Sequence, residues 1–138
     1  MRDPAALFAR VPVNRTLGFT LVSCGEGQAV LTMPVREEYL QENGYLQGGL
    51  VSAVADTAAA YALLPGLPQD RGMTGVEFKV NFLRPTLPNR GDLTARAKVV
   101  RQGRTIGVCQ VDVEQEGRAV AVATFTYLFF ERPPRQPA

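Results

Sequence analysis

The chain has 138 residues and a formal net charge of +2 at pH 7, and 46% of its residues are hydrophobic while 20% are charged. This length fits one domain with a core of its own, and the charge does not indicate a nucleic-acid-binding or membrane-surface protein. Histidine is absent, which excludes Ser–His and Cys–His nucleophile pairs and histidine-based metal sites. We therefore expect a single domain over residues 1–138, with no metal and with no nucleic-acid or membrane partner.

The beginning of the chain predicts a short helix. An Asp-Pro pair at residues 3 and 4 fits an N-cap and a first turn, so we expect a helix to about Arg10 within an N-terminal extension of about residues 1–15. This segment lacks the long apolar stretch and the cleavage site of a signal peptide. Cys24 and Cys109 are typical of core residues in a reducing compartment, so we expect a cytoplasmic protein.

Two strands joined by a tight turn are expected next. Residues 17–24 alternate loosely between apolar and polar side chains, and residues 28–34 are the expected hairpin partner across a Gly-Glu-Gly turn. Residues 35–47 mix charged side chains with tyrosine and leucine, and we expect a partly ordered loop that packs on the domain.

Residues 48–64 are the most informative segment. Alanine, leucine and valine occupy all faces of the predicted helix, and a helix that is apolar all round is normally buried. About 17 residues at about 1.5 Å each make a rod of roughly 25 Å, which crosses a small domain but is short and interrupted for a membrane span. The sequence Leu-Pro-Gly at residues 64–66 predicts its end.

One carboxylate, Asp56, interrupts this helix near its middle. An unpaired charge in a buried helix costs several kcal/mol, so its presence needs a reason. In one interpretation Asp56 only accepts hydrogen bonds from Ser52, one turn earlier, or from a neighbouring loop. In the other, which we favour, Asp56 faces a cleft and acts as a general base or as a nucleophile.

Gly48 and Gly49 stand at the start of the same helix. The first backbone N–H groups of a helix have no intrahelical partner, and at glycine no side chain shields them. Together with the helix dipole, they can bind a carbonyl oxygen that becomes negative in a transition state, so the pair is a candidate oxyanion hole. A glycine pair at a helix start also occurs as a simple turn or a close packing contact.

A meander of four strands is expected after the helix, over residues 72–83, 92–101, 104–114 and 118–131. The first of them has apolar residues on one face and mostly charged residues on the other. The proline-rich end, about residues 132–138, is expected to be disordered. This order of elements predicts an α+β fold with one antiparallel sheet wrapped around a long central helix.

Four short motifs resemble those of the hotdog-fold acyl-CoA thioesterases, specifically of the phenylacetate-pathway (PaaI-type) branch. They are GYLQGG at residues 44–49, ADTAAAYA at residues 55–62, VNFLRP at residues 80–85 and RQGR at residues 101–104. The resemblance covers nearly the whole chain, from about Leu17 to Phe130. It implies a hotdog fold and the hydrolysis of an acyl-CoA thioester, with an aryl or medium-chain acyl group, to a free acid and CoA.

The resemblance assigns catalytic roles to three residues. Gln41 falls at an amide position that orients the thioester or the attacking water, Gly48 at the glycine whose N–H polarises the carbonyl, and Asp56 at the catalytic acid. Asp56 then either activates a water molecule or attacks the carbonyl to form a mixed anhydride. Gln47 departs from the family, which most often has histidine there, but glutamine is also a hydrogen-bonding side chain.

Further residues are implied in substrate binding. Gln47, Gly49 and Asn43 adjoin the catalytic positions, although the Asn-Gly pair at residues 43 and 44 is also typical of a turn. Thr74 is a candidate for water binding, because some family members place a hydroxyl on the strand that faces the catalytic acid. Three arginines near turns are either solvated surface charges or contacts to the phosphates of coenzyme A, namely Arg84, Arg101 and Arg104.

The resemblance also implies that the protein works as an oligomer. In the family the active site lies at a dimer interface, so Asp56 of one subunit would face Gly48 and Gln41 of the other, and two such homodimers often form a homotetramer. No cofactor is implied, since coenzyme A is part of the substrate. One alternative is a non-catalytic acyl-CoA-binding protein on the same fold, against which Asp56 argues, because binding alone gains nothing from a buried acid. A purely structural, oligomer-forming domain is another alternative.

Overall fold

The computed structural model describes residues 2–133. The tail expected to be disordered, residues 132–138, lies outside the described residues except for its first two positions. In chain order the elements are α1 (Pro4–Arg10), α2 (Pro12–Leu17), β1 (Thr20–Gly25), β2 (Gln28–Met33), η1 (Glu37–Tyr39), α3 (Gly48–Leu63), η2 (Leu64–Gly66), β3 (Arg71–Phe82), β4 (Leu93–Gln102), β5 (Ile106–Gln115) and β6 (Arg118–Glu131).

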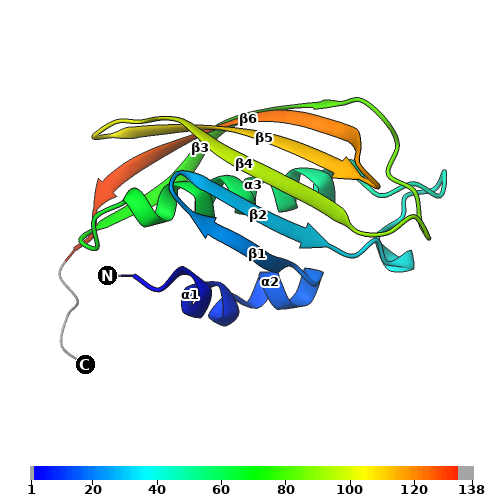
Figure 1. Cartoon of the computed structure of the whole chain (residues 1–138), viewed down its shortest axis with the longest axis horizontal. Helices are drawn as coiled ribbons and strands as arrows, with labels where there is room; N and C mark the ends of the chain where they lie inside the picture. Colours follow the sequence, from blue (N-terminus) through cyan, green and yellow to red (C-terminus); the bar gives the residue numbers. More distant parts are fainter. Residues whose placement is uncertain (1, 134–138) are drawn as a thin grey trace.

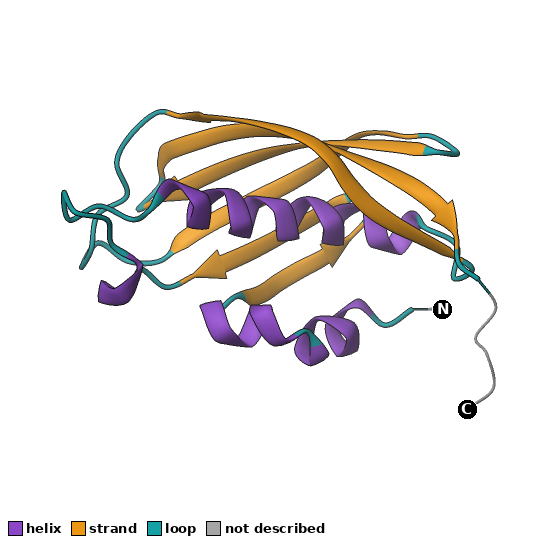
Figure 2. Ribbon diagram, turned by 180° about the vertical axis from the view of Figure 1, so that it is seen from behind, coloured by secondary structure: helices purple, strands orange, loops and turns teal. Residues whose placement is uncertain are grey.

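Six antiparallel strands form one sheet in the order β1-β2-β4-β5-β6-β3. The long helix α3 lies along the inner side of this sheet, as Figures 1 and 2 show, and packs mainly against β2, β4 and β5. The short helices α1 and α2 lie next to β1 at the edge of the sheet (Figure 1). This arrangement confirms the predicted α+β architecture of one antiparallel sheet around a long central helix.

The alanine-rich composition of α3 follows from its position against the sheet. Ala55 and Ala58 are fully buried, and their small side chains let the strands approach closely. The helix ends at Leu63, one residue before the predicted end, because Pro65 has no N–H to continue the helical ladder. By length and composition the stretch Gly48–Gly66 also resembles a membrane span, but half of that window is buried inside the molecule.

The helix α2 was not predicted, and it moves the start of the first strand. Pro12 occupies the first helical position, where a missing N–H costs nothing, and Gly18 ends the helix with a left-handed φ of 74°. The strand β1 therefore begins at Thr20 rather than at Leu17. The preceding helix α1 begins and ends as predicted, and the Asp3 carboxylate caps it.

The strand β3 forms a free edge of the sheet and leaves large apolar side chains exposed. The strand is present at Arg71–Phe82, close to the predicted residues 72–83, but α3 packs mainly against β2, β4 and β5 and leaves much of the apolar face of β3 open. Phe78 and Phe82 therefore keep 56% and 55% of their surface exposed. A β-bulge between Gly75 and Glu77 bends the strand at its middle. An open edge with an apolar face marks a surface suited to a partner.

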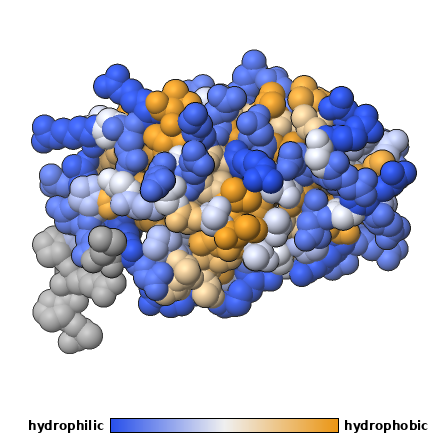
Figure 3. Space-filling model, in the orientation of Figure 1, coloured by the Kyte–Doolittle hydropathy of each residue, from blue (hydrophilic) through white to orange (hydrophobic). Residues whose placement is uncertain are grey.

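The outer face of the sheet, which points away from α3, is mostly polar. In the view of Figures 1 and 3 the strands lie in front of α3, and Figure 3 shows mostly hydrophilic side chains with apolar ones in separate patches. Arg96, Lys98 and Gln110 are exposed on neighbouring strands of this face. The core of the domain is thus on the inner side of the sheet, where the two halves of the predicted site also lie.

Candidate active site

The N-terminus of α3 presents two backbone donors. Gln47 is the N-cap of this helix, and its Oε1 accepts a hydrogen bond from the Leu50 N–H at 3.2 Å. Within residues 2–133, the N–H groups of Gly48 and Gly49 have no acceptor. The donors predicted at this position are therefore available to a ligand, and the side chain at position 47 stabilises the helix start beside them.

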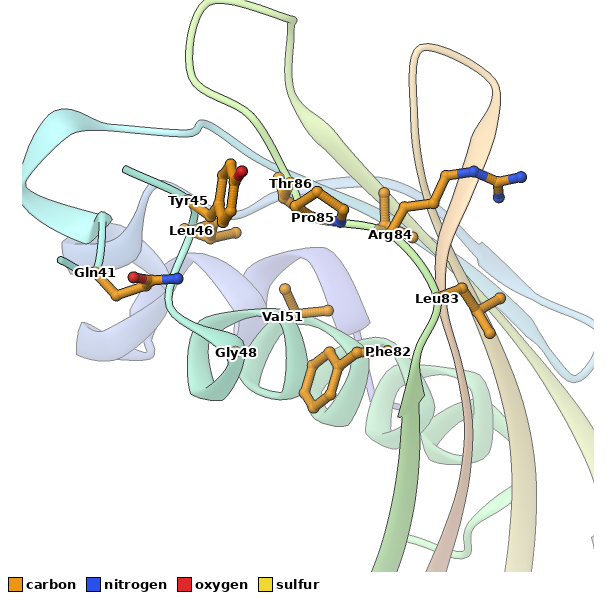
Figure 4. A pocket seen from close by; sticks show the side chains of 11 residues that line it. Gln41, Tyr45, Leu46, Gly48, Val51, Phe82, Leu83, Arg84, Pro85 and Thr86 are labelled. Carbon is orange, nitrogen blue, oxygen red and sulfur yellow. The ribbon is translucent and has the colours of Figure 1, made fainter. Parts of the chain in front are cut away.

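The loop before α3 brings Gln41 to the same place. Its main-chain carbonyl accepts from the Gly44 N–H at 2.9 Å, and its side-chain Oε1 accepts from the Asn43 N–H at 2.5 Å. The other end of the amide, Nε2, points toward the space beside Gly48 in Figure 4. Gln41 can therefore donate a hydrogen bond to a substrate carbonyl or hold a water molecule.

A cavity of about 320 Å³ opens at this end of α3 (Figure 4). Gln41 and Gly48 supply polar groups to a wall that is otherwise largely apolar, formed by Tyr45, Leu46, Val51, Phe82, Leu83 and Val120. The Phe82 ring lies directly over Gly48, since a β-carbon at position 48 would lie 3.1 Å from the ring. Glycine at this position leaves the backbone N–H open beside an aromatic wall.

The Asp56 side chain is exposed, whereas the sequence predicted a carboxylate within a buried helix. Ser52 does not pair with it, because the Ser52 hydroxyl donates to the Gly48 carbonyl at 3.2 Å. Instead, the phenol of Tyr127 on β6 contacts the carboxylate Oδ1 of Asp56, and it also lies 2.8 Å from the main-chain carbonyl of Asp56. Oδ2 has no hydrogen-bond partner among the residues that the structure describes.

A second cavity, of about 510 Å³, opens at Asp56. It lies beside the bulge of β3 and is lined by Asp56, Gly75, Val76, Glu77, Phe78 and Phe125. Tyr127, only 5% exposed, supports the carboxylate from the sheet. Burial raises the pKa of the Tyr127 phenol, and the charge of Asp56 raises it further. The phenol therefore stays protonated and donates to the carboxylate.

The two halves of the predicted site do not meet within one chain. Gly48 and Asp56 line separate cavities. They are eight residues apart, which corresponds to about 12 Å along a helix and about 80° around its axis. A thioester carbonyl bonded to the Gly48 N–H is therefore not next to the Asp56 carboxylate of the same chain. The chain therefore carries the candidate donor to a carbonyl oxygen at the start of α3 and the candidate catalytic carboxylate at the middle of this helix.

Besides Gln47 and Gly49, which adjoin Gly48 without lining either cavity, two further predicted substrate-binding residues lie away from both cavities. Asn43 is exposed in the turn before α3 and lines neither cavity. Thr74 pairs with Leu128 in the β3–β6 ladder, and the next residue, Gly75, pairs with Tyr127. Neighbouring residues of a strand point to opposite faces, and Tyr127 points to α3, so Thr74 points to the outer face. The structure does not bring the Thr74 hydroxyl to Asp56.

The three predicted phosphate-binding arginines are exposed and lie apart. Arg84 borders the cavity at the start of α3, but its guanidinium points away from Gly48 and donates to the Ala119 carbonyl at 2.8 Å (Figure 4). Arg101 and Arg104 lie at the β4–β5 turn, near the other end of α3, where Gln102 donates to the carbonyl of the last helical residue at 3.2 Å. One chain therefore does not gather the three into a single phosphate site.

Two residues of the candidate site were missed by reasoning from the sequence. Tyr127 reaches Asp56 across 71 residues, and no local pattern predicts that contact. Phe82 belongs to the motif VNFLRP. The alternation of this segment predicts a strand with one apolar face, but it does not predict that this face remains exposed. Within the part of the chain that the structure describes, no three Asp, Glu or Cys residues are grouped to hold a metal ion.

Comparisons with known proteins agree in sequence and in structure. The family model of the thioesterase superfamily matches residues 43–122. The chain is 35% identical to the acyl-coenzyme A thioesterase PaaI of Escherichia coli over 121 residues, which cover 85% of this chain and 81% of the relative. It is 32% identical to the human acyl-coenzyme A thioesterase 13 over 112 residues, which cover 80% and 78% of the two chains.

Solved structures give the same result. A thioesterase family protein from Silicibacter pomeroyi matches with a TM-score of 0.85 and 34% identity, over 94% of this chain and 96% of that one. The E. coli PaaI protein, from the phenylacetic acid degradation operon, matches with a TM-score of 0.83 and 29% identity, over 91% and 88%.

Proposed function

This chain belongs to the thioesterase superfamily and is a PaaI-type hotdog enzyme that hydrolyses acyl-CoA thioesters, and from this premise we propose its catalytic residues and its acyl group. The Gly48 N–H polarises the thioester carbonyl, and Gln41 orients the thioester or the attacking water. Asp56 acts as the general base or as the nucleophile. The acyl group is aryl or medium-chain, and the products are the free acid and CoA.

The observation that carries this proposal is the Gly48 N–H, which has no acceptor within residues 2–133 and opens into a largely apolar cavity beside the amide of Gln41. A fixed donor in apolar surroundings stabilises developing negative charge far more than the same donor does in water. The partial positive charge at the start of α3 acts in the same direction. This half of the site is thus suited to the oxyanion of a thioester in its transition state.

Asp56 supplies the other half of the chemistry. As a general base, its carboxylate takes a proton from a water molecule, the water oxygen attacks the thioester carbon, and the C–S bond breaks to release the CoA thiolate. As a nucleophile, a carboxylate oxygen attacks the same carbon, the thiolate leaves, and water hydrolyses the mixed anhydride. Both routes require the ionised carboxylate and an oxygen of it that is free to react.

The proposed mechanism places the two halves in different subunits. The free edge β3 leaves Phe78 and Phe82 exposed, and the cavity at Asp56 lies along this edge. A second copy that pairs with this edge satisfies its open ladder, covers its apolar face and brings Asp56 toward the helix start of the other subunit. The homodimer is therefore the proposed catalytic unit, and the homotetramer rests on the family resemblance alone.

The acyl group is proposed from the wall of the cavity at Gly48. Tyr45 and Phe82 give this wall an aromatic character, which suits an aryl group or a medium-length chain. The E. coli relative comes from the phenylacetic acid degradation operon, which supports an aryl substrate. Three exposed arginines remain the proposed contacts to the CoA phosphates, namely Arg84, Arg101 and Arg104.

The experiment that tests this function compares the wild type with Asp56→Asn on phenylacetyl-CoA, hydroxylated aryl-CoAs and short and medium fatty acyl-CoAs. Release of free thiol is measured, and circular dichroism checks the fold. We expect hydrolysis by the wild type and a loss of at least about 100-fold in the variant, because the amide keeps the shape but not the charge. Unchanged turnover in the variant would remove Asp56 from the mechanism. Saturable binding without turnover in both proteins would favour the non-catalytic alternative.

A further inference from the structure

We propose that Tyr127 is the positioning residue of Asp56, which holds Oδ1 of the carboxylate and leaves Oδ2 as the oxygen that acts on the substrate or on water. This inference rests on the proposed role of Asp56. The contact joins the middle of α3 to the sheet, and Tyr127 itself does not line the cavity into which Asp56 opens.

The Tyr127 side chain is rigidly placed. It is buried, and its ring packs beside Gly75, where a β-carbon would be 3.6 Å from it. Two residues earlier on β6, Phe125 stacks on Phe78 of β3 with ring centroids 5.1 Å apart. Because β6 and β3 are paired on both sides of the bulge, the phenol cannot follow a moving carboxylate. The carboxylate must adopt the rotamer that meets the phenol.

The direction of the hydrogen bond follows from the protonation of the phenol. Burial is the main cause that raises the pKa of Tyr127, and the negative charge of Asp56 is the next. The hydroxyl therefore keeps its proton at physiological pH and offers it to the carboxylate and to the nearby carbonyl of Asp56. A donor that is fixed in this way holds Oδ1 in place and leaves Oδ2 free for the step that both proposed mechanisms use.

Other titratable groups surround Asp56. Glu77 of β3 lines the same cavity, and the buried thiol of Cys109 on β5 lies near the Tyr127 phenol. The other titratable side chain of α3, Tyr61, packs against Phe8 of α1, away from this contact. Within residues 2–133, Tyr127 is the group that donates a hydrogen bond to the Asp56 carboxylate, so the position of Oδ1 depends on this phenol.

The test compares kcat and KM of Tyr127→Phe with those of the wild type. In Tyr127→Phe we expect kcat to fall about 10-fold while KM stays within about two-fold, because the ring keeps its packing but no hydroxyl holds Oδ1 of Asp56. Tyr61→Phe is the matched control, since it removes a buried phenol of α3 that has no hydrogen bond to Asp56 in the described part of the chain, and it leaves kcat unchanged.

An unchanged kcat in a folded Tyr127→Phe protein overturns the inference and leaves Asp56 in the mechanism. If Asp56→Asn instead keeps full turnover, the proposed role of Asp56 fails, and a second measurement decides the contact by itself. Crystal structures of the wild type and of Tyr127→Phe are then compared at the Asp56 side chain. A carboxylate that leaves its wild-type rotamer in the variant supports the anchoring, and an unchanged rotamer overturns it.

Discussion

The thiol of Cys109 lies in the core, directly behind the half of the site that contains Asp56. It has no exposed surface and lies 3.5 Å from the Ala59 carbonyl of α3. Burial raises the pKa of Cys109 from 9.0 to about 12, because a thiolate cannot be solvated there. Between these two pH values the folded state holds a proton that the unfolded state has lost. The free energy of unfolding therefore falls as pH rises, by at most about 1.4 kcal/mol per pH unit from this group.

Cys109→Ala should flatten this alkaline loss of stability. The variant is less stable at pH 7 by roughly 1 kcal/mol, since it leaves a small cavity, but its stability declines less steeply from about pH 9 to pH 12 than that of the wild type. Urea unfolding at several pH values measures both slopes. Cys24→Ala is the comparison, because burial also raises the pKa of this half-buried thiol but to a smaller extent, so this variant should change the slope less. Parallel slopes for the wild type and Cys109→Ala would contradict the assignment.

At the scale of the element, the start of α3 allows the Gly48 N–H to be removed without breaking the helix. Proline is well accommodated at a first helical position, and the preceding Gln47 has φ −63° and ψ 130°, which the residue before a proline favours. We expect Gly48→Pro to fold and to lose about 100-fold in kcat, as expected for one oxyanion donor.

Gly48→Ala is the matched control for this prediction. Its added methyl group meets the Phe82 ring at the same place as the proline ring carbon, but the alanine N–H remains. Steady-state kinetics on the best acyl-CoA substrate should therefore show a far smaller loss of kcat for alanine than for proline. Equal losses in the two variants would mean that crowding against Phe82, and not the missing donor, slows the reaction.

Local patterns predict the elements of this chain where a strand or helix has one regular face. The strand Arg118–Glu131 has the predicted bounds, and the Asp3 cap sets the start of α1 as expected. The helix α2 was missed because it has only six residues and buries only Asn14, so it shows no apolar stripe. Such a short segment, bounded by Pro12 and Gly18, is recognised only when its neighbours are known.

The candidate site also has a part that local sequence patterns predict and a part that they do not. The donor at the start of α3 was predictable, because a helix start has open N–H groups by its nature, whereas the place of Gln41, seven residues before Gly48, came from the family resemblance. The surroundings of Asp56 were not predictable, because they depend on the register of β6 and on how far the sheet curls over α3. That register decides that Tyr127 faces Asp56 while Thr74 points to the outer face.

At the scale of the whole molecule, the separation of Gly48 and Asp56 in two cavities predicts shared active sites. We expect a heterodimer of Asp56→Asn and Gly48→Pro subunits to regain about half of the wild-type turnover per dimer. One of its two sites combines the intact Asp56 of one subunit with the intact Gly48 of the other, and the second site lacks both. Two affinity tags isolate the heterodimer, and free thiol release measures its activity.

The reciprocal heterodimer is the control that makes this result decisive. It pairs a wild-type subunit with a subunit that carries both substitutions, so it has the same composition of intact and altered residues. If sites are shared between subunits, each of its sites lacks one component, and its turnover falls to the level of the single variants. If each chain instead builds its own site, this heterodimer keeps half of the activity and the first heterodimer has almost none. The two arrangements therefore predict opposite rankings of the same two proteins, independently of which acyl group is cleaved.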